Sequence, residues 1–333
     1  MPGVKRLDPV ALFAPLANNS RLGLAVSGGP DSLALMLLMA QWVRRGGPEL
    51  FVYTVDHGLR PEAADEAAMV VREAERLGLT ARLLRWEGAK PVTGVQAAAR
   101  KARYKLIAAA MKRDEVELLA TAHHLGDQAE TVLMRMAHGS GIDGLRGMDT
   151  LSVVEGCEIV RPLLGVESAS LHAVVDAAGL TAATDPSNLD PAYERVRWRE
   201  LQPALSVEGL TPARLAVFAR RMDQAGMLVA DAAQAAWYEL VEWTGQGKLT
   251  LPHDRFAALN PLVGASLLGS LLEEVSGDRR PASLGALESL QEKLQRPERL
   301  KPATLHGCII SADGKVIRLR REGPRGKSAR AKA

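Results

Sequence analysis

The chain has 333 residues, of which 47% are hydrophobic and 24% are charged, and its formal net charge is +3. These values are typical of a soluble globular protein, and the length is sufficient for an α/β core with a smaller second domain. No apolar run is long enough to span a membrane, and the segment Met1 to Pro9 lacks the apolar region of a secretory signal. We therefore expect no membrane association and no export.

The two cysteines, Cys157 and Cys308, lie far apart and form no CxxC pair. This predicts a reducing, cytoplasmic location, without a thiolate zinc site or an iron–sulfur cluster. Positive charge is concentrated at the C-terminal end, where residues 315–333 hold eight Lys or Arg and a single acid, Glu322. That segment is either a contact for a polyanionic partner or a solvated tail, and its composition leaves both readings open.

The predicted elements of the first half alternate between strands and helices. After a short helix from Leu7 to Ala17, the expected strands are residues 22–26, 50–55, 81–86, 116–120 and 159–160, and the expected helices are 33–42, 61–77, 95–111, 127–137 and 171–178. Such alternation predicts an α/β fold with a doubly wound parallel sheet, in which ligands bind beyond the carboxyl ends of the strands. Polar clusters at Ser27, Asp56 and His123 each follow a strand, so we expect them to share one site.

A glycine-rich turn links the first strand to the first long helix. It reads Ser27, Gly28, Gly29, Pro30, Asp31 and Ser32. Two glycines allow the backbone to approach a ligand closely, and amides at a helix N-terminus with two hydroxyls form a cradle for phosphate oxygens. The turn is not a Walker loop, which requires GxxxxGK followed by Ser or Thr. An ordinary strand-to-helix turn that contains two glycines is the alternative interpretation.

The pattern changes after Arg161. The expected elements there are a polar, basic linker in residues 184–188 and 195–199, a long helix from 212 to 243, a helix from 283, and a hairpin with strands 305–310 and 316–319. Pro212 after Thr211 marks the start of the long helix, and Asp313 with Gly314 marks the hairpin turn. These elements predict a catalytic α/β domain in residues 1–205 and a smaller, mainly helical region in residues 206–333.

Candidate catalytic side chains follow the fourth strand. His123 and His124 precede a helix whose first turn holds Asp127. A carboxylate there is suited to hold Mg²⁺, and an imidazole is suited to donate to phosphate oxygens. Two alternatives stay open: a transition-metal site, for which no third well-spaced His or Cys is present, and a structural helix cap formed by His124. Asp56 and His57, after the second strand, could bind a nucleotide's ribose or base, or could simply cap a loop.

Two arginine-rich stretches are candidates for phosphate or RNA contacts. They contain Arg100 and Arg103 on the polar side of the helix 95–111, and Arg195, Arg197 and Arg199 around Trp198. Such spacing suits phosphate contacts, with Trp198 either stacking on a base or packing in the core. A solvated helix face in the first stretch, and a basic surface helix anchored by Trp198 in the second, fit the same residues.

The loop motif SGGPDS resembles the pyrophosphate loop of the ATP pyrophosphatases, enzymes that split ATP into AMP and pyrophosphate. Further motifs follow in family order: DHGLR at 56–60, RKARY at 100–104, TAHHLGDQAET at 121–131, HGSGIDGLRGM at 138–148, RPLL at 161–164 and DPSN at 185–188. This ordered set is similar to the tRNA(Ile)-lysidine synthetase family, whereas the C-terminal third matches only loosely. Members of that family adenylate the wobble cytidine of an isoleucine tRNA with a CAU anticodon, and L-lysine then displaces AMP to give lysidine.

The resemblance implies a role for each candidate residue. ATP would be bound by the loop from Ser27 to Ser32 with Asp56 and His57, and Mg²⁺ would be held by Asp31 and Asp127. The catalytic residues would be Asp31, His123, His124, Asp127 and Arg195. The contacts to tRNA or to the adenylated intermediate would come from Arg100, Arg103, Arg197 and Arg199. The chain departs from the family pattern at Gly126, where the family usually has aspartate, and at Val196, where the usual asparagine is missing. Because Asp127 remains, activity is expected.

Other functions share parts of this pattern. A tRNA sulfur transferase of the 2-thiocytidine type would use paired cysteines, and an amidotransferase such as GMP synthetase would need a glutaminase domain, neither of which is visible. An inactive tRNA-binding module stays an alternative because of Gly126. The C-terminal region and basic tail are expected to bind tRNA, and the sequence leaves open whether the chain forms a homodimer.

Overall fold

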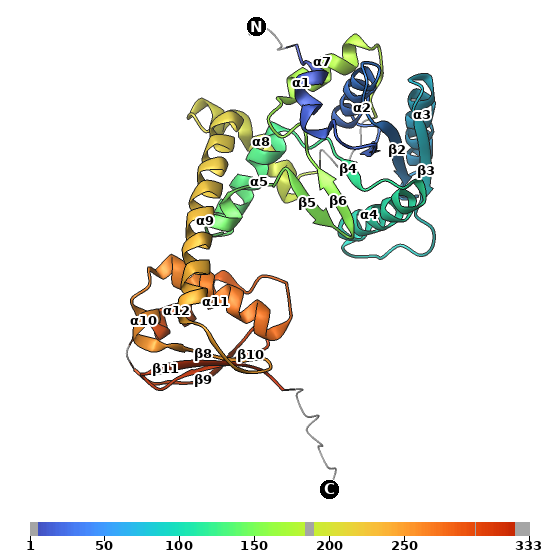
Figure 1. Cartoon of the computed structure of the whole chain (residues 1–333). Helices are drawn as coiled ribbons and strands as arrows, with labels where there is room; N and C mark the ends of the chain where they lie inside the picture. Colours follow the sequence, from blue (N-terminus) through green and yellow to red (C-terminus); the bar gives the residue numbers. More distant parts are fainter. Residues whose placement is uncertain (1–5, 184–189, 297, 324–333) are drawn as a thin grey trace. The chain divides into compact units, whose positions relative to one another are not determined.

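The computed structural model describes residues 6–183, 190–296 and 298–323 (Figure 1). The chain divides into two compact units: residues 1–139 with 144–220 form unit 1, and residues 140–143 with 221–333 form unit 2. The sequence predicted a division near residue 205. By contacts it falls between Arg220 and Arg221, inside the long helix α9 (Pro212–Leu240), which no proline interrupts after its first residue.

Unit 1 is built on a six-stranded sheet with the order β3-β2-β1-β4-β6-β5. Its strands are β1 (Arg21–Ala25), β2 (Glu49–Asp56), β3 (Thr80–Arg85), β4 (Leu118–Ala120), β5 (Leu151–Val154) and β6 (Cys157–Val160). All neighbours pair in parallel except β5 and β6, so the expected parallel sheet carries one antiparallel edge strand. The strand order reverses between β1 and β4, and ligands bind at such a switch point in α/β sheets.

Helices cover both faces of this sheet (Figure 1). The helices of this part of the chain are α1 (Pro9–Phe13), α2 (Pro30–Val43), α3 (Glu62–Arg76), α4 (Val95–Asp114), α5 (Leu125–Ala137), α6 (Ile142–Leu145), which is divided between the two units, α7 (Ser168–Ala177) and α8 (Glu194–Val207). Residues of α1, α2, α3 and α7 share one hydrophobic cluster with the sheet, and residues of α4 share another. Ten of the 14 residues of α2 are buried, which holds the phosphate loop at its N-terminus in place.

The basic stretch 195–199 lies in α8, so the expected linker is wrong for these residues. Packing is the reason: Val196 is buried, and the partly buried Trp198 packs against a cluster that includes Ala129 and Leu133 of α5 and Leu215 of α9. The alternative of a basic helix anchored by Trp198 is therefore confirmed. The other half of that linker, residues 184–188 with the DPSN motif, lies outside the described residues.

Unit 2 combines helices with a five-stranded antiparallel sheet of order β7-β8-β11-β10-β9. Its elements after α9 are β7 (Glu242–Gly245), β8 (Lys248–Pro252), α10 (His253–Ala257), α11 (Pro261–Ser276), α12 (Leu284–Leu294), β9 (Leu300–Leu305), β10 (Cys308–Ala312) and β11 (Val316–Arg321). The predicted hairpin is confirmed as β10 and β11. The other three strands were not expected, because short strands with one polar face give a weak apolar signal. Within the described residues, no helix has the length and apolar character needed to cross a bilayer.

Candidate active site

Hydrogen bonds of Ser27 and Ser32 fix the conformation of the glycine-rich turn between β1 and α2. The Ser27 N–H donates to Ser32 Oγ (3.2 Å), the Ser32 hydroxyl donates to the Gly29 carbonyl (2.9 Å), and the two serine Oγ atoms lie 3.3 Å apart. Gly28 has φ +88°, a left-handed conformation that side chains disfavour. Gly29 is the N-cap of α2 and offers no side-chain acceptor to the first-turn amides. Those amides have no partner within the helix and are suited to bind an anion.

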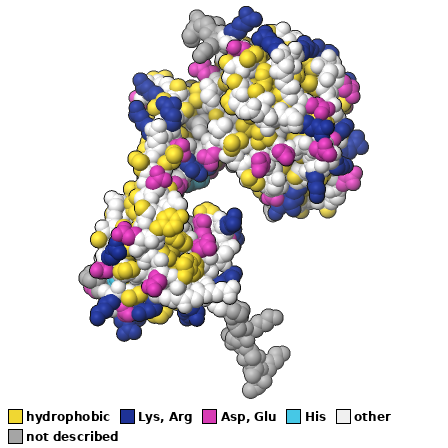
Figure 2. Space-filling view, in the orientation of Figure 1, with side chains coloured by type: hydrophobic (Ala, Val, Ile, Leu, Met, Phe, Trp, Pro, Cys, Tyr) yellow, Lys and Arg dark blue, Asp and Glu magenta, His cyan; other side chains and the backbone are white. Residues whose placement is uncertain are grey.

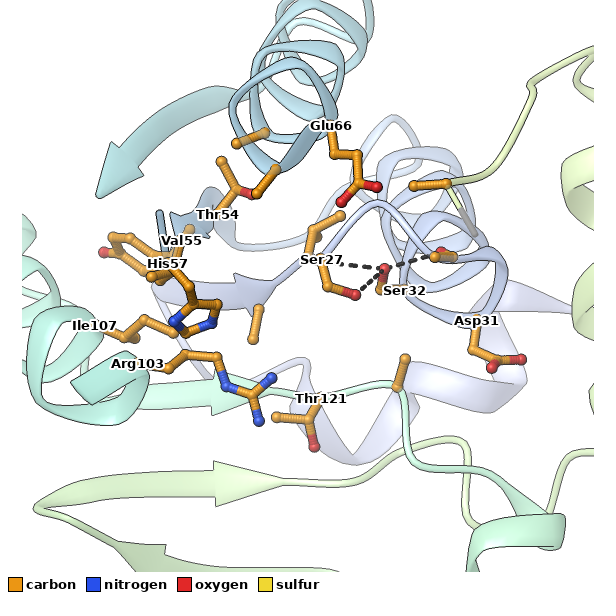
Figure 3. Close-up of a pocket in the computed structure, with 18 of the residues that line it drawn as sticks. Ser27, Asp31, Ser32, Thr54, Val55, His57, Glu66, Arg103, Ile107 and Thr121 are labelled. Atoms are coloured by element: carbon orange, nitrogen blue, oxygen red, sulfur yellow. Dashed lines mark hydrogen bonds between the residues drawn. The ribbon is translucent and has the colours of Figure 1, made fainter. Parts of the chain in front are cut away.

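A cavity of about 440 Å³ lies beside this turn. That volume falls in the range of small-molecule sites. Among the residues that line it are Ser27, Gly29, Pro30, Asp31, Ser32, Thr54, Val55, His57, Glu66, Arg103, Thr121, His123, Asp127 and Arg199. Figure 3 shows Arg103 extending from α4 into the cavity, toward Ser27 and Thr121. The Nε atom of Arg103 is buried and has no hydrogen-bond partner among the described residues, so it is available to donate to a ligand in the cavity.

Asp31 and Asp127 meet around one imidazole. His124 Nε2 lies 3.6 Å from Oδ2 of Asp31 and 3.6 Å from Oδ2 of Asp127. His124 is the N-cap of α5: its Nδ1 accepts the Gly126 N–H (2.9 Å), and Asp127 Oδ2 accepts the His124 N–H (3.0 Å). Because Nδ1 is an acceptor, the proton of the neutral ring sits on Nε2, between the two carboxylates. The cap reading of His124 is confirmed, and the same contacts fix the ring beside the candidate metal ligands.

His123 is a neutral side chain at the cavity wall. Its Nδ1 lies 2.9 Å from Thr121 Oγ1. Burial lowers the pKa of His123 to about 4, and the positive charges of Arg161, Arg195 and Arg100 act in the same direction, although the charge of Asp127 opposes them. The imidazole is therefore uncharged at neutral pH and can exchange hydrogen bonds with a ligand without adding to the local positive charge.

The two arginines of α8 nearest the site are anchored by a carboxylate that the sequence analysis did not single out. Glu130 is 3% exposed, accepts from Arg199 Nε (2.7 Å) and pairs with Arg195 Nε (3.1 Å). The hydrogen bond to Glu130 raises the pKa of Arg199. Arg199 Nη2 also lies 3.8 Å from Asp127 Oδ1, so Glu130 holds this guanidinium at the cavity. The signal in the sequence was the acidic residue one turn after Asp127 on the same helix face.

Six predicted residues lie outside the cavity lining: Gly28 and His124, whose places are given above, and four others. Asp56 accepts the Gly58 N–H (2.8 Å) within its own turn, and Arg100 is exposed, with its Cζ 5.1 Å from the centre of the Tyr104 ring. Arg195 donates a hydrogen bond to Thr131 and pairs with Glu130. Arg197 donates to the carbonyls of Pro191 and Ala192. His57, by contrast, lines the cavity and packs edge-on against Trp86, with 6.1 Å between the ring centres.

Two side chains of α7 also approach Asp31. The Ser168 hydroxyl lies 3.4 Å from Asp31 Oδ1, and His172 Nε2 lies 3.6 Å from the same oxygen. The sequence offered no signal for them, because α7 is brought to α2 only by packing. They contact Oδ1 of Asp31, whereas His124 lies near Oδ2.

The donor set of the site fits Mg²⁺. In the described part of the chain, no group of three or more His, Cys, Asp or Glu side chains is arranged to hold a metal ion by itself. Mg²⁺ does not need one, because it binds through one or two carboxylates together with water and substrate phosphates. Asp31 and Asp127 both line the cavity next to the phosphate loop, where the phosphates of a nucleotide would complete such a set.

Comparison with known proteins agrees with this geometry. Residues 6–205 match the PP-loop domain family. A tRNA(Ile)-lysidine synthase from a Bradyrhizobium species is 44% identical, with 94% of this chain and 93% of the relative covered, and one from Rhodopseudomonas palustris is 46% identical, with 91% of each covered. The U34-tRNA thiolase NcsA from Methanococcus maripaludis has a similar fold, with a TM-score of 0.53 and 17% identity over 65% of this chain and 76% of that one. The chain belongs to the tRNA(Ile)-lysidine synthase family of PP-loop proteins.

Proposed function

We propose that this protein adenylates the wobble cytidine of an isoleucine tRNA with a CAU anticodon and then joins lysine to the base, giving lysidine. The observation that carries the proposal is the meeting of Asp31 and Asp127 around His124 beside the phosphate loop. It is supported by relatives with that activity in their name, which share 44% and 46% of their residues with this chain over nearly its whole length.

The first step would use the groups around the cavity. The cytidine O2 attacks the α-phosphorus of ATP and pyrophosphate leaves, so negative charge must be stabilised on the phosphate oxygens. The loop amides and Ser27 would bind the pyrophosphate portion, and Arg103 would face it from α4. We therefore assign Arg103 to ATP and not to tRNA. Mg²⁺ held by Asp31 and Asp127 would offset phosphate charge, and His124 Nε2–H would hold these carboxylates in place.

The second step replaces one bond to the base with another. The amine of lysine attacks C2 of the cytidine, the C2–O bond breaks, AMP leaves with that oxygen, and the amine loses a proton. Arg199, held by Glu130 at the cavity, would stabilise the departing phosphate, and neutral His123 would donate a hydrogen bond there without changing the charge. Arg195 would act through Glu130, which it shares with Arg199.

The test is incorporation of labelled lysine into an isoleucine tRNA with a CAU anticodon, in the presence of ATP and Mg²⁺. A methionine tRNA with the same anticodon is the control. We expect incorporation into the isoleucine tRNA alone, with one AMP and one pyrophosphate formed per lysine. ATP cleavage without incorporation would point to another nucleophile, and no cleavage at all would favour an inactive tRNA-binding module. Asp127→Asn and Arg195→Ala then test the assigned roles.

A sulfur-transfer reaction is the nearest alternative. The two cysteines of this chain are buried and unpaired, Cys157 in unit 1 and Cys308 in unit 2. Burial raises the pKa of both thiols, that of Cys308 to about 11, so neither is a reactive thiolate at neutral pH. These thiols also fit our proposal of a reducing, cytoplasmic location.

We also propose that unit 2 binds the tRNA, through the face of its sheet that the helices leave open. Buried residues of β8, β10 and β11 point to α11 and α12, so their neighbours in the strand point to the opposite face. On that face Arg320 pairs in register with Lys248, and Arg318 pairs with Thr250. Figure 2 shows Lys and Arg side chains along the lower margin of this unit. Such a face suits the phosphate backbone of RNA.

Charge removal on this face is the test of that proposal. Lys248→Gln with Arg320→Gln should weaken tRNA binding and lower the dependence of log K on log salt by about two, one for each phosphate contact. An unchanged slope would contradict the assignment. The predicted basic segment spans residues 315–333, of which 324–333 lie outside the described residues, and deletion of residues 322–333 tests the role of the tail separately. Gel filtration or light scattering would decide whether the chain forms a homodimer.

A further inference from the structure

Arg161, the first residue of the RPLL motif, is a buried cation at the functional edge of the sheet. It follows β6 directly, and the neighbouring strand β4 is followed by Thr121, whose N–H donates to the Val160 carbonyl (3.0 Å). The two carboxyl ends therefore lie side by side, with Arg161 next to Thr121 and His123. The residue is only 6% exposed, and its Nη1 donates to the carbonyl of Asp149 (2.7 Å).

This burial lacks the compensation that other arginines of unit 1 receive. Arg199 pairs with Glu130, and Arg82 pairs with Asp114 at 2.8 Å. Arg161 makes no ion pair with any residue that the structure describes, and its Nε is buried without a hydrogen-bond partner. A buried guanidinium is costly unless an anion offsets its charge. A site that contains a buried guanidinium without an ion pair is therefore suited to bind an anionic ligand.

The charge of Arg100 acts on Arg161, and Arg100 shares the ring of Tyr104 with Arg103. The Cζ atoms of Arg100 and Arg103 both lie 5.1 Å from the centre of the buried Tyr104 ring. Burial is the main cause that lowers the pKa of Arg161, and the charge of Arg100 acts in the same direction, whereas Tyr104 and the charge of Asp149 oppose it. The charges of Arg161 and Arg100 also both act on His123. The positive charges in this corner therefore make each other's burial less favourable, and a bound anion would offset this repulsion.

The corner around Arg161 lies outside the lining of the cavity beside the glycine-rich turn. Arg103 lines the cavity, whereas Arg161 and Arg100 do not. Arg100 is exposed on α4, together with Lys101 and Lys105. Residues 95–105 hold four Lys or Arg and no acid, so the part of α4 around Arg100 carries several positive charges. An extended polyanion fits several such charges better than a single carboxylate does.

We propose that Arg161, together with Arg100, binds a phosphodiester of the RNA substrate next to the nucleotide cavity, beside Thr121 and His123. The proposal rests on the proposed action on tRNA and adds a contact to it: a phosphate that flanks the target cytidine. Binding that phosphate in a buried corner would fix the cytidine relative to ATP, because the backbone on one side of the base is then held at a defined distance from the sheet edge.

The test measures binding of the full chain to an anticodon stem-loop RNA. One methylphosphonate, which is neutral, replaces either of the phosphates that flank the target cytidine or a phosphate in the stem. For the wild-type protein, one flanking substitution should weaken binding about tenfold, as expected for loss of a charge-assisted contact. Arg161→Gln should weaken binding of the charged RNA by a similar factor and show no further loss on the neutral linkage. Arg161→Lys should retain part of the discrimination.

Arg113→Gln, on the same helix α4 and also exposed, controls for the loss of one charge. Arg100→Gln keeps the test valid if Arg161→Gln does not fold, since the exposed Arg100 should show the same phosphate-selective loss on a smaller scale. The proposal is overturned if the variants lose affinity equally for all RNA backbones, because Arg161 would then only hold the Asp149 segment in place. It is also overturned if the KM for lysine rises and RNA binding does not change. Absence of lysine incorporation by the wild-type protein would instead refute the proposed function, because RNA binding is measured independently.

Discussion

Replacing Gly126 by alanine should separate activity from stability. A Cβ at position 126 would lie 2.7 Å from Cε1 and 3.1 Å from Nδ1 of His124, so the imidazole must turn away and lose its bond to the Gly126 N–H. Loss of an N-cap costs about 1 kcal/mol, whereas glycine to alanine in a helix gains up to about 1 kcal/mol. The two effects nearly cancel, so the midpoint of urea unfolding should change little.

Activity should respond far more strongly, because His124 Nε2 would leave its position 3.6 Å from both Asp31 and Asp127. Misplacing a group of an active site by about 1 Å can cost about 10²-fold in rate, which is the loss we expect in lysine incorporation. Gly285→Ala is a matched control: Gly285 is also the second residue of its helix, and a Cβ there meets no atom within 4 Å. Wild-type activity in Gly126→Ala would show that the cap does not position His124.

Three further outcomes follow from the site. The pKa of His123 is about 4 in the folded chain, below the 6.5 of the free side chain. Between these two pH values the unfolded state therefore binds more protons than the folded state. The free energy of unfolding should rise by up to about 3 kcal/mol as pH increases from 4 to 6.5. NMR titration of His123 and urea unfolding of His123→Gln check this, and an ordinary titration near 6.5 would contradict it. Glu130→Gln should lower the free energy of unfolding in urea by about 2–3 kcal/mol. This is less than for a fully buried ion pair, because Arg195 and Arg199 reach solvent. The control Glu49→Gln, which removes an exposed ion pair, should lower it by under about 1 kcal/mol. Chelation of Mg²⁺ should abolish pyrophosphate release without changing the melting temperature, and Asp127→Asn should raise the Mg²⁺ concentration needed for half-maximal rate. An unchanged Mg²⁺ requirement in that variant would remove Asp127 from the metal site.

The sequence predicted the elements of unit 1 well where the signal was local. Strand β1, the turn at Ser27 and helix α2 follow from apolar runs separated by two glycines, and each is present in the structure. Residues 195–199 failed as a linker because the burial of Trp198 depends on α5 and α9, which are distant in the sequence. Of unit 2, the helices α9 and α12 were predicted, but among its strands only the hairpin around Asp313 was visible, since its turn residues are specific while the other strands are short.

The sequence by itself determined the phosphate loop, the alternation of strands and helices, and the edge of the sheet where the polar clusters meet. These depend on residues adjacent in the chain and on the geometry common to parallel sheets. Only the tertiary structure decided what surrounds each arginine. Arg103 of α4 lines the cavity, and Arg199 of α8 pairs with Glu130. Arg161, at the end of β6, is buried and makes no ion pair with any residue that the structure describes. The direction of a long side chain is set by what packs around it, and that is a property of the assembled fold.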